Sequence, residues 1–205
     1  MGLISNGTTI FDAGALDSGL AKGAMTFIKK LTASSSGTLS FVHGSSSVVL
    51  DGTYKEYLFT FNNIHPATDN VDFMFNLSVD SGSNYNVTKT TTHIWTANYE
   101  SINLNYFAYG TNLDLAQSTA FQIITDNVGN ENDESSSGTM TLFNPSSTTF
   151  VKHFMTDINT YGQDNSSYRN LVAGYGNTTS AVNAIQFKFN SGNIDAGDIC
   201  LYGIA

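Results

Sequence analysis

Hydrophobic and polar residues alternate with a period of two in several short segments, the pattern of half-buried β-strands. The clearest is the segment 71–79, VDFMFNLSV, in which every second residue is large and apolar. The segments 54–62 (YKEYLFTFN) and 184–190 (AIQFKFN) repeat the alternation. The last segment, 198–204 (DICLYGI), is apolar on both faces, so we expect the C-terminal strand to have neighbours on both sides.

Clusters of Ser, Gly, Asn and Asp separate the segments, as turns would. Short strands at this spacing, without the helical period that βαβ units need, predict an all-β, antiparallel β-sandwich over residues 24–205. Residues 1–23 are expected to form an extended N-terminal arm, loosely turned from Asp12 to Gly19; packing on a neighbouring subunit and an ordinary chain end both stay open. Eleven strands are predicted, at 25–33, 37–43, 54–62, 71–79, 94–109, 121–126, 138–143, 150–158, 171–175, 184–190 and 198–204.

The composition of the chain excludes some classes of binding partner. The 205 residues include 87 Ser, Thr, Asn and Gly but only 12% charged residues, and the formal net charge is -9. Eight scattered cations cannot neutralise a row of phosphates, so we expect neither nucleic acid nor an anionic membrane surface as a partner. No secretory pattern and no long apolar stretch is found, which predicts a product of the cytoplasm without membrane insertion. Cys200 is alone and is interpreted as a small apolar strand residue.

No motif for catalysis is present. The four histidines, His43, His65, His93 and His153, are isolated in sequence, and no nucleophile elbow, phosphate loop or dinucleotide fingerprint occurs. We therefore predict no catalytic residue, no metal ligand set and no cofactor. The acidic stretch from Asp126 to Glu134 leaves two interpretations open: a solvated turn, or a calcium site whose glycine does not fit an EF-hand loop.

Amphipathic aromatic residues gather in two segments and are the candidates for binding. Exposed Trp and Tyr suit carbohydrate- or protein-binding surfaces because they give a large contact area at low entropic cost. The competing interpretations are that the rings of the first segment fill the core and that the second segment is a long exposed connection. The predicted receptor-binding residues are Trp95, Tyr99, Tyr106 and Tyr109 in the segment 94–109, with Tyr161 and Tyr168 in the segment 161–168.

Several blocks of sequence resemble a group of small virion structural proteins encoded by tailed bacteriophages of marine bacteria, particularly those that infect cyanobacteria. The pattern of the last block, with Ser-Gly-Asn-Ile between two strands, also looks like the closing hairpin of jelly-roll domains on phage appendages. The blocks, which cover much of the chain, are LISNGTTIFD (3–12), MTFIKKLTASSSGTLSF (25–41), YKEYLFTFNNIHPATD (54–69), LFNPSSTTFVKHF (142–154) and AIQFKFNSGNIDAGDICLYGI (184–204).

The resemblance implies a non-enzymatic structural protein of the virion, folded as a jelly roll and assembled as a homotrimer in the host cytoplasm. Its partners would be copies of itself, other virion proteins and a glycan or protein of the host surface. We expect a tail fibre or tail tip component that takes part in host attachment. The alternative is a capsid decoration protein, a cement or head fibre protein. A carbohydrate-active enzyme on the same sandwich is the third hypothesis.

Overall fold

The computed structural model describes residues 3–12, 15–16, 23–102 and 104–205, and every regular element within them is a β-strand. The predicted all-β class is confirmed. Along the chain the strands are β1 (Leu3–Ser5), β2 (Thr8–Asp12), β3 (Ala15–Leu16), β4 (Met25–Thr32), β5 (Leu39–Val42), β6 (Glu56–Pro66), β7 (Val71–Ser78), β8 (Lys89–Tyr99), β9 (Asn105–Tyr109), β10 (Gln122–Val128), β11 (Ser136–Phe143), β12 (Lys152–Gly162), β13 (Ser166–Gly176), β14 (Ala184–Phe189) and β15 (Ile194–Ile204).

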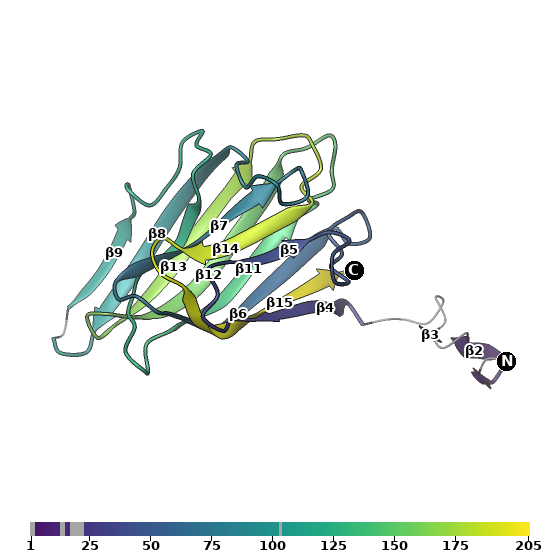
Figure 1. Cartoon of the computed structure of the whole chain (residues 1–205), viewed down its shortest axis with the longest axis horizontal. Helices are drawn as coiled ribbons and strands as arrows, with labels where there is room; N and C mark the ends of the chain where they lie inside the picture. Colours follow the sequence, from purple (N-terminus) through teal and green to yellow (C-terminus); the bar gives the residue numbers. More distant parts are fainter. Residues whose placement is uncertain (1–2, 13–14, 17–22, 103) are drawn as a thin grey trace.

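The strands from β4 to β15 form one connected sheet that folds over into two layers (Figure 1). The large layer has the order β4-β15-β6-β11-β12-β13-β8-β9, and the small layer has the order β10-β7-β14-β5. The pair of Val128 with Gly162 joins the layers at one corner. All pairings are antiparallel, so the structure is the expected antiparallel sandwich.

The pairing within the sandwich is nested. Strand β4 pairs with β15, β5 with β14, β6 with β11, and β7 with β10. This is the connectivity of one long antiparallel hairpin that has been rolled up, because the first strand pairs with the last and each inner pair follows in turn. The strands β4, β5, β6 and β7 therefore alternate between the large and the small layer.

Two hairpins are inserted into this nested order. Strands β8 and β9 come between β7 and β10, and strands β12 and β13 come between β11 and β14. Together they continue the large layer beyond β11 in the order β12-β13-β8-β9. The ladders from β12 to β13 and from β13 to β8 each run for 11 residue pairs without a bulge. We call these four strands the sheet extension.

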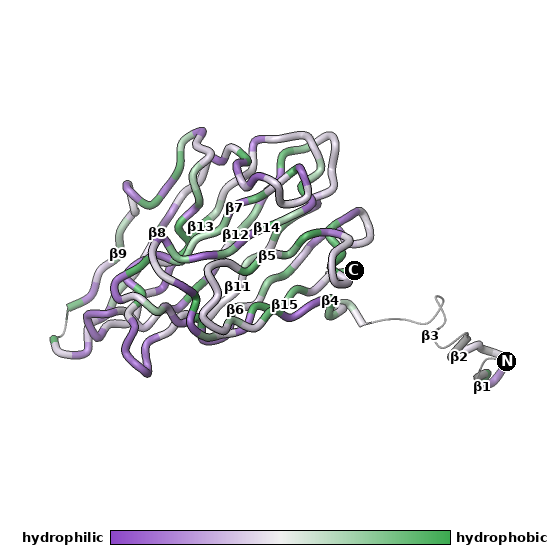
Figure 2. The backbone as a smooth tube through the Cα atoms, in the orientation of Figure 1, coloured by the Kyte–Doolittle hydropathy of each residue, from purple (hydrophilic) through white to green (hydrophobic). Residues whose placement is uncertain are grey.

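Aromatic rings fill the core between the small layer and the strands β6, β11 and β15. Phe187 of β14 lies at the centre of this cluster and is fully buried. Figure 2 shows hydrophobic positions recurring along these central strands. The alternation in the segments 54–62, 71–79 and 184–190 thus marks core positions as predicted, except at Val79, which is 39% exposed. The ring of Phe187 lies between 5.3 and 6.4 Å, centroid to centroid, from the rings of Phe41, Phe59, Phe61, Phe73 and Phe75.

Under the sheet extension the core also contains a buried polar network, beside apolar residues such as Phe154, Ile158 and Val172. His93 Nε2 lies 2.8 Å from Asn170 Oδ1, and the amide of Asn170 donates to Thr125 Oγ1 over 2.8 Å. The hydroxyl of Thr125 in turn lies 2.6 Å from that of Thr160. Buried polar groups are stable only when they are hydrogen-bonded. The network therefore fixes β8, β13 and β12 against β10 and so positions the outer strands of the extension.

Lys89, the first residue of β8, is fully buried in this polar region. Its Nζ donates to Asn76 Oδ1 over 2.5 Å and to the carbonyl of Val87 over 2.8 Å. Both acceptors are neutral, so the ammonium group has hydrogen bonds but no counter-charge from them. Burial lowers the pKa of Lys89 to about 7. The charge of this lysine is therefore sensitive to pH near neutrality.

Some element predictions need correction. The segment 94–109 is not a single strand: it contains the end of β8, a turn and β9, because the chain reverses after Tyr99. Strands β1 to β3 were not expected; they pair among themselves. Of the arm segment from Asp12 to Gly19, residues 13–14 and 17–19 lie outside the described residues. The C-terminal strand β15 lies between β4 and β6, as its two apolar faces predicted.

Replacing the buried lysine, Lys89→Met, is expected to remove a pH dependence of stability. In the unfolded chain this lysine titrates near 10.5, against about 7 in the fold, so the unfolded state binds more protons between these values. Its contribution therefore makes the free energy of unfolding rise with pH from about 7 to about 10, on the order of a few kcal/mol. Urea unfolding of the Lys89→Met variant across this range should show a flatter slope.

The exposed Lys55 provides the matched control. The Lys55→Met variant should keep the slope of the wild-type protein. An unchanged slope in Lys89→Met would contradict the burial of a lysine whose pKa is lowered.

Candidate binding surface

All six predicted binding residues lie on the sheet extension. Trp95 and Tyr99 belong to β8, Tyr106 and Tyr109 to β9, Tyr161 to β12 and Tyr168 to β13. The expectation that 161–168 is a loop or a long exposed connection is wrong, because Tyr161 and Tyr168 lie near the end and near the start of two paired strands. The turn between these strands covers only residues 163–165.

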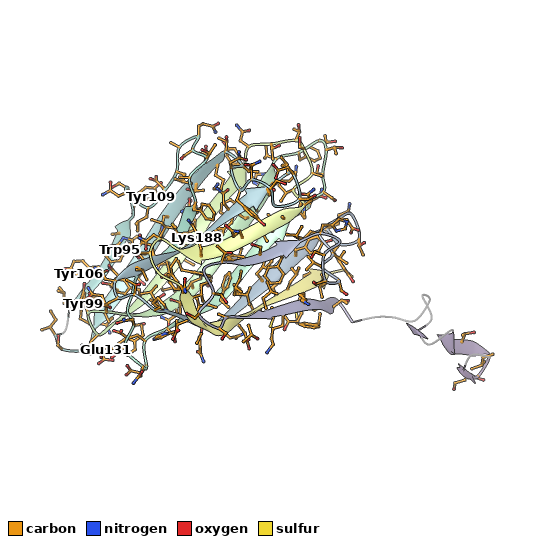
Figure 3. All side chains as sticks on the ribbon, in the orientation of Figure 1. Trp95, Tyr99, Tyr106, Tyr109, Glu131 and Lys188 are labelled. Atoms are coloured by element: carbon orange, nitrogen blue, oxygen red, sulfur yellow. The ribbon has the colours of Figure 1, made fainter. Side chains whose placement is uncertain are left out.

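Four of the six residues form one aromatic cluster. The ring centroid of Trp95 lies 6.1 Å from that of Tyr106 and 6.0 Å from that of Tyr168. The ring of Tyr99 lies 6.0 Å from that of Tyr106 in an edge-to-face arrangement. Their side chains share a face because Tyr106 and Tyr168 both pair with Ala97, which stands between Trp95 and Tyr99 on β8. Figure 3 shows Trp95, Tyr99 and Tyr106 together at the margin of the sandwich.

Tyr168 supports this cluster from below rather than contacting a partner, since it is only 3% exposed. Its hydroxyl donates to Asp164 Oδ2 over 2.8 Å and lies 3.4 Å from the hydroxyl of Tyr99. Burial raises the pKa of Tyr168, and the hydrogen bonds with Tyr99 and Asp164 raise it further, so the phenol stays neutral. Its ring packs on Gly162, where an added Cβ would lie 2.6 Å from Tyr168 Cε2.

Tyr109 and Tyr161 lie on the other face of the sheet extension. Tyr109 pairs with Ile94, and its hydroxyl donates to Asp114 Oδ2 over 2.7 Å. This hydrogen bond raises the pKa of Tyr109. Tyr161 pairs with Ser167 on β13, and its hydroxyl donates to Asn165 Oδ1 over 3.0 Å. The six residues therefore do not form one site: four cluster, and two lie on the opposite face.

The strand β9 and the turn before it expose more apolar surface than the sequence indicated. Phe107 is 78% exposed, and Tyr106 and Tyr109 are 46% and 47% exposed. Ile102 and Leu104 of the turn add two exposed aliphatic side chains, at 53% and 36%. Strand β9 pairs only with β8 among the described strands. It is an edge strand with free backbone groups and exposed rings on both faces, a combination typical of a docking surface.

We call this surface the aromatic edge and define it by Trp95, Tyr99, Tyr106, Phe107 and Tyr109. The predicted binding residues did not include Phe107, the most exposed ring of this surface. Because side chains alternate along a strand, the ring next to Tyr106 has to lie on the opposite face, where Phe107 is 78% exposed. The alternation within 105–109 could have placed Phe107 on the face opposite Tyr106. It was missed because the predicted single strand 94–109 does not contain the turn before β9.

No group of three or more His, Cys, Asp or Glu side chains that could hold a metal ion occurs in the part of the chain that the structure describes. In the acidic stretch, Asp126 belongs to β10, and Glu134 is only 3% exposed. The carboxylate of Glu134 accepts a hydrogen bond from the backbone N–H of Glu131 over 2.7 Å. This hydrogen bond closes the loop between Glu131 and Glu134.

Comparisons of the chain with protein-family models, curated proteins and solved structures found no match. No helix of the length and apolarity needed to cross a membrane occurs among the described residues. The binding properties of the aromatic edge are therefore inferred from its own residues alone.

Trp95 is the one tryptophan of the chain and reports on the aromatic edge. Replacing its neighbour, Tyr106→Ala, should expose the indole, because the Tyr106 ring lies 6.1 Å away on the same face. We expect Trp95 emission to shift to longer wavelength and to be quenched more strongly by acrylamide. Tyr109→Ala, a change of equal exposure on the other face, should leave both readouts unchanged. Equal effects of the two variants would contradict the placement of these rings.

Proposed function

We propose that this chain is a non-enzymatic structural protein on the surface of a tailed-phage virion, part of a tail fibre or tail tip, and that it takes part in host attachment. The observation that carries the proposal is the aromatic edge. An exposed edge strand with three large rings beside a half-buried Trp and Tyr gives a binding surface of large area. The assignment to a phage particle rests on the sequence resemblance.

The fold supports this proposal. The nested strand pairs, with alternation between the layers, are what a jelly roll of two Greek keys would have, and we infer that the sandwich is of this type. The aromatic edge belongs entirely to inserted hairpins, so the scaffold and the binding surface are separate parts of the chain. Function on such folds is carried by the site and not by the scaffold.

Copies of the same chain are proposed as partners, in a closed trimer. Both ends of the large layer are edge strands, β4 and β9, and both expose apolar side chains. On β4, Met25 and Phe27 are 54% and 57% exposed. Edges of this kind are usually covered in stable proteins, and an assembly of identical subunits supplies the cover.

Capsid decoration is the second candidate function, and the N-terminal strands favour it. Strands β1, β2 and β3 form a sheet of their own that pairs with no described strand of the sandwich. A separate N-terminal sheet suits an anchor that docks on a shell. The aromatic edge favours the attachment function, because a pure cement role gives it no partner.

The attachment proposal is tested by adsorption of phage particles that carry Tyr106→Ser and Phe107→Ser together. Both side chains are exposed, so the fold should persist while the binding surface is lost. We expect adsorption to host cells to fall by about tenfold or more. The control pair, Phe150→Ser and Met155→Ser, removes exposed apolar side chains outside the aromatic edge and should leave adsorption unchanged. Normal adsorption of the β9 variant would contradict the proposal.

A further inference from the structure

A small polar pocket lies at the ends of β8, β12 and β13, next to the aromatic edge. Its volume is about 230 Å³, and it is lined by Asn98, Tyr99, Glu100, Asn159, Tyr161 and Ser167, with Thr160 beside them. This is below the ~300–1,000 Å³ of pockets that take drug-sized ligands, so it suits a single small ring. Amide, hydroxyl, carboxylate and phenol groups all meet in this space.

The amide of Asn159 is held in one orientation. Its Nδ2 donates to Ser167 Oγ over 3.0 Å and to the carbonyl of Tyr168 over 2.8 Å. With both amide hydrogens engaged, Oδ1 of Asn159 is left as an acceptor, and the hydroxyl of Ser167 keeps its own hydrogen to donate. Ser167 pairs directly with Asn98 of β8, whose exposed amide adds a donor and an acceptor.

Tyr161 supplies the ring of the pocket, because the side chain of Tyr99 lies on the opposite face with Trp95 and Tyr106. The hydroxyl of Tyr161 donates to Asn165 Oδ1 in the turn between β12 and β13, over 3.0 Å. The backbone N–H of Glu100 donates to the carbonyl of Asn165 over 3.0 Å, which ties the end of β8 to the same turn. The lining is therefore ordered before any ligand enters, which lowers the entropic cost of binding.

The charge around the pocket selects against anions. Glu100 contributes a carboxylate, and none of the described lining residues is Lys or Arg. The nearby Arg169 is engaged by Asp157 through two hydrogen bonds of 2.9 and 2.7 Å. Burial raises the pKa of Tyr161, and the negative charges of Glu100 and Asp133 raise it further, which shows that the surroundings are acidic. A phosphate or a carboxylate-bearing ligand would be repelled here.

We propose that this pocket binds a single ring of a neutral saccharide. Ring hydroxyls would donate to the Glu100 carboxylate and to Asn159 Oδ1, and would accept from Asn98 and Ser167. The C–H face of the sugar would pack on the ring of Tyr161, whose π face is negative. The site is open and small, so we expect dissociation constants on the order of millimolar for a free sugar, with tighter binding by several linked copies.

The biological role of this pocket rests on the attachment function proposed above, but the binding itself can be tested with the purified full chain. A glycan array that carries neutral and acidic glycans identifies a ligand. The matching free sugar is then titrated by NMR, with sialic acid and choline as probes for an anion site and a cation site. We expect neutral glycans alone to bind, and Tyr161→Ala and Asn98→Ala each to weaken that binding about tenfold.

The matched control is Tyr175→Ala, a tyrosine of the same face at the far end of β13 with similar partial burial. It should leave saccharide affinity unchanged. Asn98 is exposed, so its loss should not disturb the fold if Tyr161→Ala does. Binding of choline or sialic acid but no neutral glycan, no glycan binding at all, or affinity unaffected by Asn98→Ala would each overturn the proposal. If the purified chain binds saccharide while phage particles with Tyr106→Ser and Phe107→Ser adsorb normally, the attachment function is refuted and the pocket is not.

Discussion

The unbroken ladder from β12 through β13 to β8 is the constraint on which the binding surfaces depend. Two stretches of 11 residue pairs without a bulge carry the large layer past the strands that pair in nested order. The extension is held against strand β10 of the small layer. A hydrogen-bonded network of His93, Asn170 and Thr125 supplies this hold on the inner face. Strand β9 is left as a free edge, and its rings face solvent.

The core combines an aromatic cluster around Phe187 with a buried hydrogen-bonded network under the sheet extension, and the two contribute differently. The Phe187 cluster stabilises the scaffold by burial of apolar surface, a contribution that has no preferred direction. The polar network fixes the positions of the strands it joins, because hydrogen bonds are directional. A surface that has to present rings and amides in a fixed arrangement benefits from the second kind of support. This explains why Tyr168, buried and bonded to Asp164, matters more as a support than as a contact.

Period-two alternation predicted the aromatic cluster of the core, because one face of those strands is packed against the core along its length. Phe73, Phe75 and Phe187 are buried as that pattern requires. The polar network was beyond such reasoning: Lys89 is buried although lysine is an exposed residue by type, and a tertiary hydrogen bond to Asn76, together with a local one to the carbonyl of Val87, makes this possible. The aromatic cluster was found in part, from the density of rings in 94–109. The polar pocket was not, since Asn98, Asn159 and Ser167 are ordinary polar residues until pairing brings β8, β12 and β13 together.

A binding module of this design, carried on a virion as part of an appendage, would be present in few copies, whereas a decoration protein would follow the symmetry of the shell. The most direct test is the copy number of this chain in purified phage particles, measured by quantitative mass spectrometry against the major capsid protein. We predict a small number of copies, a few trimers per particle. Copies on the order of hundreds would contradict the appendage function in favour of decoration. Absence from the particle would contradict a virion role altogether.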